Sequence, residues 1–260
     1  MSSVTLSHQG AVAIIRLTNP ERGNSVTMEM ASALDAIAEQ VAQDTRVRAV
    51  LLASSGNMFC VGGDIGGFAA HADNSTAFLH KLADTLHRAM KRLFAMPKPF
   101  VVAVNGAAAG AGMSLALSGD AVIAGRAASF TAAYSAVGLT PDGGMSWILP
   151  RLVGLRMAQQ MILSNRRVKA DEALQLGLVT EVVEDSELEA RALAVAENFA
   201  KAAVGAVSMA RRLMIDGGST SLVDHLDREA VEISKASATA ESREGVAAFL
   251  ARRPANFAGQ

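Results

Sequence analysis

The 260-residue sequence has few charged residues, a single cysteine and no excess of basic side chains. Charged residues make up 19% of the chain, whereas an average globular protein has about 25%. Much of the surface is therefore expected to be buried, in the core or against partner subunits. The net charge of −1 provides no overall basic field for nucleic acid or an anionic membrane. Because Cys60 is the only cysteine, no internal disulfide can form, and a reducing cytoplasm is the expected location.

The sequence also lacks a metal-binding pattern and an N-terminal signal. Its five histidines show no metal-ligand spacing. His80 and His87 lie two helical turns apart among charged residues, which indicates a solvated helix face. The first residues have neither the basic nor the apolar region of a signal peptide. Residues 100–119 are uncharged and long enough for a bilayer, but their glycines, serines and asparagine favour a buried strand, a glycine turn and a buried helix.

Short apolar runs alternate with helical patterns through most of the chain. The runs that predict strands are residues 11–17, 47–53, 100–104, 121–125 and 178–183. The second and third of these lie about 50 residues apart, and each is followed by a glycine-rich turn, which indicates a repeated strand–strand–helix unit. The chain length fits one large α/β domain, with or without an appended helical piece.

Helical spacing and capping residues predict the remaining elements. Thr27 can cap a helix, and Ser186 with Glu189 matches the capping box of a later one. Further helices are expected over about 204–214, 221–239 and 242–252. We therefore predict an α/β body over residues 1–200 and a helical tail over residues 201–260.

The two glycine-rich turns carry the clearest chemical signal. A main-chain N–H can approach a ligand oxygen closely only where side chains are small. Two such groups that converge on one point stabilise charge on a carbonyl oxygen, as in an oxyanion hole, and a helix N-terminus after the second turn adds positive potential. Each turn alone is more often a plain connection. A dinucleotide site is not favoured, because Leu115 stands where the third glycine of G-x-G-x-x-G belongs.

Four segments resemble the enoyl-CoA hydratase/isomerase (crotonase) family. They are FCVGGDI at 59–65, AVNGAAAGAG at 103–112, VGLTPDGGMSWILPRLVG at 137–154 and REGVAAFLARRPANF at 243–257. The resemblance spans nearly the whole chain and is strongest to the ring-epoxide isomerase members of phenylacetate breakdown. It implies a crotonase (ClpP-like) superhelix of repeated ββα units with a C-terminal helical oligomerisation region. It also implies an acyl-CoA substrate and a homotrimer or a dimer of trimers.

The same resemblance implies roles for individual residues. Gly63 and Ala111 would donate the two oxyanion-hole N–H groups, and Asp142 would act as the acid/base. The substrate- and CoA-binding set would be Arg22, Ser25, Val26, Val61, Asp64, Ile65, Ser114, Tyr134, Phe249 and Arg252. The last two resemble tail residues that close the CoA site of a neighbouring subunit, although a solvated helix end explains Arg252 equally well. No metal and no permanently bound cofactor is implied, because CoA arrives as part of the thioester substrate.

Two positions depart from the hydratases of the family. Hydratases use two glutamates, and this chain has Ser114 and Tyr134 there, neither of which ionises near neutral pH without help. Asp142, in the segment TPDGG, is the remaining acid, as in isomerase and dehalogenase members, although the same segment alone reads as a plain turn. One carboxylate is enough to move a proton between two carbons, and an apolar pocket makes it a better base. The residues expected to form that pocket are Met113, Trp147 and Ile148.

Several functions stay open at the level of the sequence. The leading hypothesis is an isomerase that shifts a double bond or opens a ring epoxide through an enolate held by the oxyanion hole. The alternative is an enoyl-CoA hydratase (a lyase) of fatty-acid or aromatic-acid degradation that uses Asp142 and bound water. Claisen-type and dehalogenation chemistry share the same enolate site. Outside these reactions stand a serine hydrolase at Ser114, whose surroundings fall short of a G-x-S-x-G elbow, and a non-catalytic CoA-binding protein.

Overall fold

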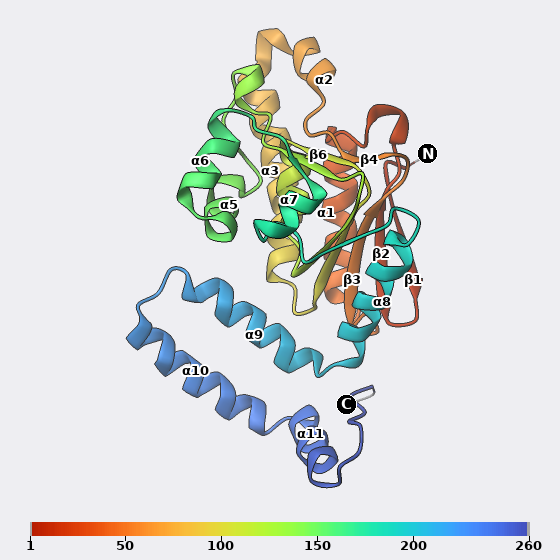
Figure 1. Ribbon diagram of the computed structural model, residues 1–260, viewed down its shortest axis with the longest axis vertical. Coiled ribbons are helices and arrows are strands. Elements are labelled where there is room, and N and C mark those ends of the chain that lie inside the picture. The colour runs from red at the N-terminus through yellow and green to blue at the C-terminus, as the bar shows by residue number, and fades with distance from the viewer. Residues whose placement is uncertain (1, 259–260) are drawn as a thin grey trace.

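The computed structural model describes residues 2–258 as two sheets covered by helices, with three further helices extending from one end (Figure 1). The strands are β1 (Val4–Gln9), β2 (Val12–Leu17), β3 (Ala49–Ser54), β4 (Met58–Cys60), β5 (Phe100–Val104), β6 (Ala107–Ala109), β7 (Ala121–Gly125), β8 (Ser129–Thr131), β9 (Val168–Lys169) and β10 (Glu181–Val183). The helices are α1 (Met28–Gln43), α2 (Ile65–Ala70), α3 (Ser75–Ala95), α4 (Ala111–Ala116), α5 (Met145–Val153), α6 (Leu155–Leu163), α7 (Ala170–Gln175), α8 (Leu188–Lys201), α9 (Val204–Gly217), α10 (Leu222–Ser237) and α11 (Ala240–Leu250).

From β3 to β8, successive strands alternate between the two sheets. The larger sheet has the order β1-β2-β3-β5-β7-β10 and is parallel except for the β1–β2 hairpin. The smaller sheet has the order β4-β6-β8-β9, and its β4–β6 and β6–β8 pairs are parallel. The first two strand pairs along the chain that span both sheets are each followed by a helix: β3-β4 by α2, and β5-β6 by α4. The α/β class and the repeated strand–strand–helix unit predicted from the sequence are therefore confirmed.

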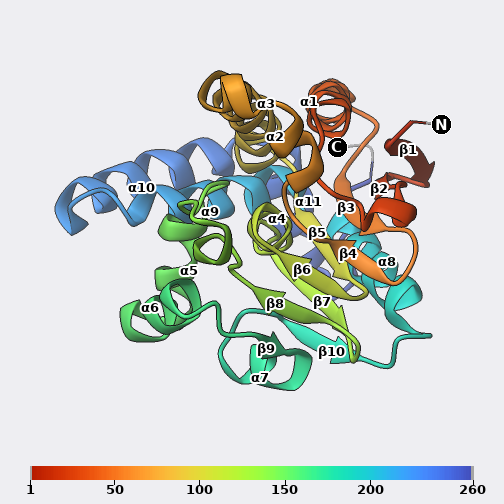
Figure 2. The ribbon, with the colours of Figure 1, turned by 90° about the horizontal axis from the view of Figure 1, so that it is seen from above.

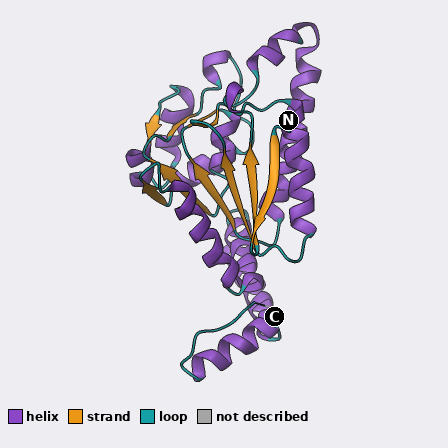
Figure 3. Cartoon of the chain, turned by 90° about the vertical axis from the view of Figure 1, so that its right-hand side faces the viewer, coloured by secondary structure: helices purple, strands orange, loops and turns teal. Residues whose placement is uncertain are grey.

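The larger sheet is buried on both faces. Along β3, Val50 and Leu52 face the main core, whereas Leu51 faces a second cluster that also contains Val101 of β5 and Leu188 of α8. A sheet covered on both sides needs apolar residues at every position, so β3 and β5 are continuous apolar runs in the sequence. Figure 3 shows the strands fanned out between the helices of the two faces.

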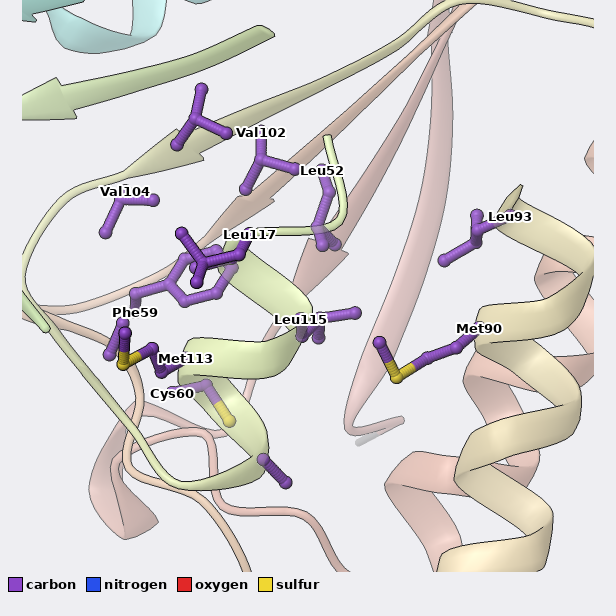
Figure 4. Close-up of a cluster of buried hydrophobic side chains, with 14 of the residues drawn as sticks. Leu52, Phe59, Cys60, Met90, Leu93, Val102, Val104, Met113, Leu115 and Leu117 are labelled. Carbon is purple, nitrogen blue, oxygen red and sulfur yellow. The ribbon is translucent and has the colours of Figure 1, made fainter. Parts of the chain in front are cut away.

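Helix α4 lies in the middle of the core. All six of its residues are buried. Met113 lies beside Phe59, whereas Leu115 points toward the Met90 side chain of α3 (Figure 4). The uncharged stretch 100–119 is thus a buried strand and a buried helix, as predicted. The glycine turn between them contains a short strand, β6, that the sequence did not indicate, because its three residues are alanines and alanine has low strand propensity.

The two predicted helix caps have different outcomes. The Thr27 hydroxyl accepts a hydrogen bond from the Met30 amide at 3.1 Å and begins α1, as expected. The capping box at Ser186 and Glu189 was wrong. Helix α8 begins at Leu188 after Glu187, and no side chain caps it. Ser186 is one residue too early for its hydroxyl to reach the first free amides of the helix.

The helices after residue 203 extend away from the sheets (Figure 1). Buried Arg211 attaches α9 to the body, because its guanidinium donates to the Asp120 carboxylate at 2.5 Å and to the main-chain carbonyl of Phe94 at the end of α3. The predicted tail helices are confirmed, with ends that differ by a few residues. The division of the chain into units at residue 200 stays a prediction.

Within residues 2–258, no single helix has both the length and the apolar character needed to cross a membrane. Helices α8 and α9 together pass the same test of length and composition, but they meet at an angle of 105°. The apolar side chains of α8 have another role, because Leu188, Ala192, Ala196 and Ala200 cover the second face of the larger sheet.

Candidate active site

Two loops meet where the parallel strands β4 and β6 end. The strands pair through Met58 with Ala107 and Cys60 with Ala108, so their carboxyl ends lie at the same edge of the smaller sheet, where open α/β sheets tend to bind ligands. Figure 2 shows β4, β6 and β8 side by side, with α4 beginning at the end of β6. The first loop runs through residues 61–64, and the second through residues 110–111.

Two glycines let these loops touch. A side-chain carbon on Gly62 would lie 2.7 Å from the Ala109 carbonyl oxygen and 3.4 Å from the Gly110 α-carbon. Gly62 and Gly110 also have φ of +90° and +52°, which side-chain-bearing residues rarely adopt. The contact holds the next residue of each loop, Gly63 and Ala111, close to its counterpart. Within residues 2–258, the amide N–H groups of these two residues donate no hydrogen bond to the rest of the chain.

Gly63 and Ala111 both line a cavity of about 500 Å³. The wall is largely aliphatic and comes from the two loops, the N-terminal half of α3 and the segment after β8. Its residues are Val26, Val61, Gly62, Gly63, Ile65, Thr76, Leu79, His80, Leu82, Ala83, Leu86, Gly110, Ala111, Ala133, Tyr134, Val137, Leu139, Thr140 and Asp142. Among the described residues that line the cavity, Asp142 is the one carboxylate, and there is neither lysine nor arginine.

Asp142 is held by Tyr134 and its surroundings. The Tyr134 hydroxyl donates a hydrogen bond of 2.6 Å to the carboxylate at Oδ1. Burial raises the pKa of Tyr134 far above its usual range, and the nearby Asp142 charge raises it further. The phenol therefore stays protonated and acts as a donor, never as an ionised base. Asp142 itself is partly exposed, with 30% of its side chain accessible.

Ser114 of α4 contacts both Asp142 and Tyr134. Its hydroxyl donates to the main-chain carbonyl of Asp142 at 2.9 Å and lies 3.2 Å from the Tyr134 hydroxyl. The residue is fully buried and does not line the cavity. A nucleophilic serine needs a base within hydrogen-bond reach and access to substrate. No histidine contacts Ser114 within the described chain, so its placement gives no support to a serine hydrolase.

The expected CoA-binding residues lie on two loops that are joined by main-chain hydrogen bonds. The Val26 amide donates to the Gly62 carbonyl at 2.8 Å, and the Asp64 amide donates to the Val26 carbonyl at 3.2 Å. Val26, Val61 and Ile65 line the cavity. The neighbouring side chains Arg22 and Asp64 form an exposed ion pair at 3.3 Å. Ser25 is buried beside Val26 and does not line the cavity.

The two tail residues of the predicted set lie far from this cavity. Phe249 is 83% exposed near the end of α11, and Arg252 follows it with a φ of +53°. Neither belongs to the cavity wall of its own chain. Helix α11 lies at the end of the molecule opposite α2 (Figure 1). Any contribution of these residues to a site would therefore be to that of another subunit, which stays a prediction.

The pocket residues expected around Asp142 were wrong. Met113 is buried inside the core, Trp147 is 44% exposed under the Arg151 guanidinium, and Ile148 is a buried residue of α5. None of them lines the cavity. Nearness in sequence misled the prediction, because α5 turns away from Asp142 after Gly144. The apolar wall comes instead from α3, about 60 residues earlier, as the lining residues Leu82 and Leu86 show.

His87 was also misassigned. The sequence indicated a solvated helix face, but the His87 Nε2 accepts a hydrogen bond of 2.9 Å from the Gly143 amide and lies 3.6 Å from Asp142 Oδ2. The sequence did contain one signal for this placement. Leu86 belongs to the apolar stripe of α3 that packs inward, and His87 is the next residue. Only the tertiary structure shows that Asp142 faces this stripe. Within residues 2–258, no cluster of side chains has the composition of a metal site.

Comparison with known proteins agrees with this arrangement. Residues 7–260 match the family model described as Enoyl-CoA hydratase/isomerase. The chain therefore belongs to the enoyl-CoA hydratase/isomerase family, whose members process acyl-CoA thioesters on a crotonase fold.

Some relatives are named isomerases and others hydratases. A 1,2-epoxyphenylacetyl-CoA isomerase of Escherichia coli (strain K12) is 35% identical, with full coverage of both chains. A short-chain-enoyl-CoA hydratase of Clostridium acetobutylicum is 31% identical and covers 97% of this chain and 96% of its own. The crystal structure of an enoyl-CoA hydratase from Polaromonas sp. JS666 superposes with a TM-score of 0.93 at 31% identity, covering 97% and 98% of the two chains.

Proposed function

We propose that the protein is an acyl-CoA isomerase that moves a double bond of an enoyl thioester, with Asp142 as its single acid/base. The observation that carries the proposal is the composition of the cavity wall. Among the described residues it contains one carboxylate, Asp142, together with the free amides of Gly63 and Ala111. Addition of water by the two-glutamate route of the hydratases needs a second ionised base, whereas isomerisation needs one.

The reaction runs through an enolate. The thioester carbonyl would accept hydrogen bonds from the Gly63 and Ala111 amides, which stabilise the negative charge as it develops on the oxygen. Asp142 takes a proton from the carbon next to the carbonyl, and the electrons of that C–H bond move to the carbonyl oxygen. The protonated Asp142 then returns the proton two carbons further along, and the double bond comes to lie next to the carbonyl. No metal or resident cofactor takes part.

The cavity wall also supports a substrate class. The lining is mostly aliphatic and holds no lysine or arginine, so a terminal carboxylate on the acyl group would be desolvated beside Asp142 without a counter-charge. We therefore propose an uncharged acyl group. The 1,2-epoxyphenylacetyl-CoA isomerase among the relatives makes an aryl epoxide thioester a reasonable member of the test panel.

The test compares the wild type with Asp142→Asn on 3-enoyl-CoA, 2-enoyl-CoA and an aryl-epoxide thioester, with identification of the products. Asparagine keeps the size and the acceptor for Tyr134 but cannot take a proton. We expect isomerisation by the wild type and a fall in kcat of roughly 100- to 10,000-fold in the variant. Retained isomerisation in the variant would rule out Asp142 as the base. Faster hydration than isomerisation by the wild type would favour the hydratase.

A further inference from the structure

We propose that His87 is a positioning residue for Asp142, and that it works only as a neutral ring with its proton on Nδ1. The inference rests on the proposed function, because it concerns the orientation of the same acid/base. His87 does not line the cavity, so it acts on the reaction through the turn that carries Asp142 and does not touch the substrate.

The main chain around Asp142 is held from two helices. On one side, the Asp142 carbonyl accepts hydrogen bonds from the Ser114 hydroxyl of α4 at 2.9 Å and from the Met145 amide at 3.1 Å. On the other side, the next amide, that of Gly143, donates to His87 of α3 at 2.9 Å. These bonds fix the Asp142–Gly143 peptide group at both its carbonyl and its amide, which leaves the turn little freedom to rotate the carboxylate.

The hydrogen bond from Gly143 determines the tautomer of His87. An amide N–H can only donate, so Nε2 must offer its lone pair, and the proton of a neutral ring then lies on Nδ1. The distance of 3.6 Å between Nε2 and Asp142 Oδ2 is therefore no ion pair in this state. The ion pair would need a proton on the same nitrogen that Gly143 already occupies, so the shorter contact to Gly143 decides the assignment.

This arrangement leaves one oxygen of the carboxylate free. Tyr134 occupies Oδ1 at 2.6 Å, whereas Oδ2 faces the lone-pair side of His87 and receives no hydrogen bond from it. Oδ2 is thus the oxygen that can take the substrate proton. Protonation of His87 would reverse the situation: Nε2 would lose its acceptor role for Gly143 and would place a positive N–H beside Oδ2. Asp142 would then lose its fixed orientation, and its negative charge would be paired with the positive ring.

The ionisable groups around the ring lie on α3 and on the elements near it. They are His80, Asp84, Arg88 and Lys91 of α3, Asp35 of α1, Arg151 of α5 and Tyr134. Arg88 binds Asp84 and Asp35, Arg151 stacks on the Trp147 ring, and Tyr134 donates to Asp142. Among the described residues, Asp142 is the carboxylate that lies within 4 Å of the His87 ring nitrogen. A proton gained by His87 would therefore act on Asp142, and activity should fall when the ring is protonated.

Three variants test the inference. His87→Leu removes the acceptor and leaves the Gly143 amide unpaired. His87→Gln can keep an acceptor oxygen near the Nε2 position but cannot be protonated. Lys91→Leu is the matched control, one turn further along α3, where the side chain is exposed. We expect kcat for the 3-enoyl-CoA to fall roughly 10- to 100-fold in His87→Leu with little change in KM, and to stay within about threefold of the wild type in His87→Gln and Lys91→Leu.

The pH profile distinguishes positioning from a plain structural role. The wild type and Lys91→Leu should lose activity in acid as His87 gains a proton. His87→Gln, which cannot gain one, should keep in acid the activity that it has at neutral pH. A kcat and pH profile in His87→Leu equal to those of the wild type would overturn the inference. The same conclusion would follow if glutamine failed to restore activity and left the acid decline in place.

A spectroscopic measurement keeps the test independent of turnover. Nitrogen-15 NMR of the histidine-labelled protein, assigned by comparison with His87→Gln, should show a neutral ring with the proton on Nδ1 at pH 8. A proton on Nε2 would overturn the inference whatever the activity. If the wild type turns over no acyl-CoA while the tautomer is as expected, the proposed function fails and the placement of His87 stands. If Asp142→Asn is inactive and His87→Leu is fully active, only the present inference fails.

Discussion

Tyr134 is buried, and its hydroxyl donates a hydrogen bond to the Asp142 carboxylate. Since burial and the nearby charge raise its pKa, it remains a donor throughout the useful pH range. Removal of the hydroxyl in Tyr134→Phe should lower kcat by roughly tenfold, because the carboxylate loses the bond that orients it. Steady-state kinetics check this effect, and an unchanged kcat would contradict it.

Cys60 lies directly below the first loop and is fully buried. Burial raises the pKa of its thiol from 9.0 to about 12. Because the folded value is the higher one, this group leaves stability intact below about pH 9, and stability is lost as the pH rises toward about 12. The thiolate is the reactive form, so iodoacetamide at pH 8 should label Cys60 only as the protein unfolds. Mass spectrometry over time measures this, and rapid labelling of the native protein would contradict it.

At the residue scale, sequence reasoning placed the two amide donors and the acid on segments that share one cavity. It missed His87 and named the wrong apolar neighbours, Met113, Trp147 and Ile148. The difference has a physical cause. The loop residues carry local signals, namely glycine and proline where the backbone needs them, whereas a packing partner on another helix leaves no such local signal.

At the scale of elements, the β4 and β6 loops must touch for the two amides to converge. Gly62→Ala should separate them, because the new carbon would lie 2.7 Å from the Ala109 carbonyl oxygen. We expect a loss of about 2 to 4 kcal/mol in the free energy of unfolding and a fall in kcat of at least about tenfold. Gly10→Ala is the matched control, since Gly10 also has a positive φ of +56° but has no atom within 4 Å of the added carbon.

The control separates backbone strain from steric contact. Gly10→Ala should lose only about 1 to 2 kcal/mol from the left-handed conformation and should keep its kcat. Urea denaturation and steady-state kinetics measure the two quantities. Equal losses of stability and activity in both variants would mean that the contact between the loops does not matter.

The sequence predicted the elements of the larger sheet well, because strands buried on both faces give unbroken apolar runs such as residues 47–53 and 100–104. The smaller sheet was harder to predict. Its strands β4, β6 and β8 have three residues each, too few for a periodicity to show. They are stabilised by their pairing with one another, which is a non-local interaction.

At the scale of the whole molecule, the tail leaves a large apolar surface exposed. Its exposed large apolar side chains are Met214, Leu222, Val223, Leu226, Val231, Ile233, Val246, Phe249 and Leu250. So many exposed apolar side chains on three helices indicate an interface, and we predict a homo-oligomer, a trimer or a dimer of trimers. Light scattering should give a mass that is a multiple of three times the 27.0 kDa of one chain.

A pair of variants localises the interface. Ile233→Glu on α10 should lower the measured mass, because a charge would have to be buried against the partner. Leu174→Glu on α7 of the body, which replaces a side chain that is 44% exposed, should leave the mass unchanged. A monomeric wild type would contradict the prediction, as would an Ile233→Glu variant that keeps the full mass. Location in the cytoplasm stays a prediction from the single cysteine.

By itself, the sequence determined the fold class, the buried strands, the tail helices and several of the loop segments that line the cavity. These properties depend on local patterns: apolar periodicity, capping residues, and glycine where φ is positive or chains meet. They could be read without knowing which segments are neighbours in space.

Only the tertiary structure decided which groups act on Asp142. Its partners Tyr134, Ser114 and His87 come from three different parts of the chain, and their distances depend on how the helices pack on the sheets. The cavity is likewise a product of packing, because α3 supplies its apolar wall and the strand ends supply its amides. Contacts between residues far apart in sequence arise from the burial of whole faces, and no local pattern encodes them.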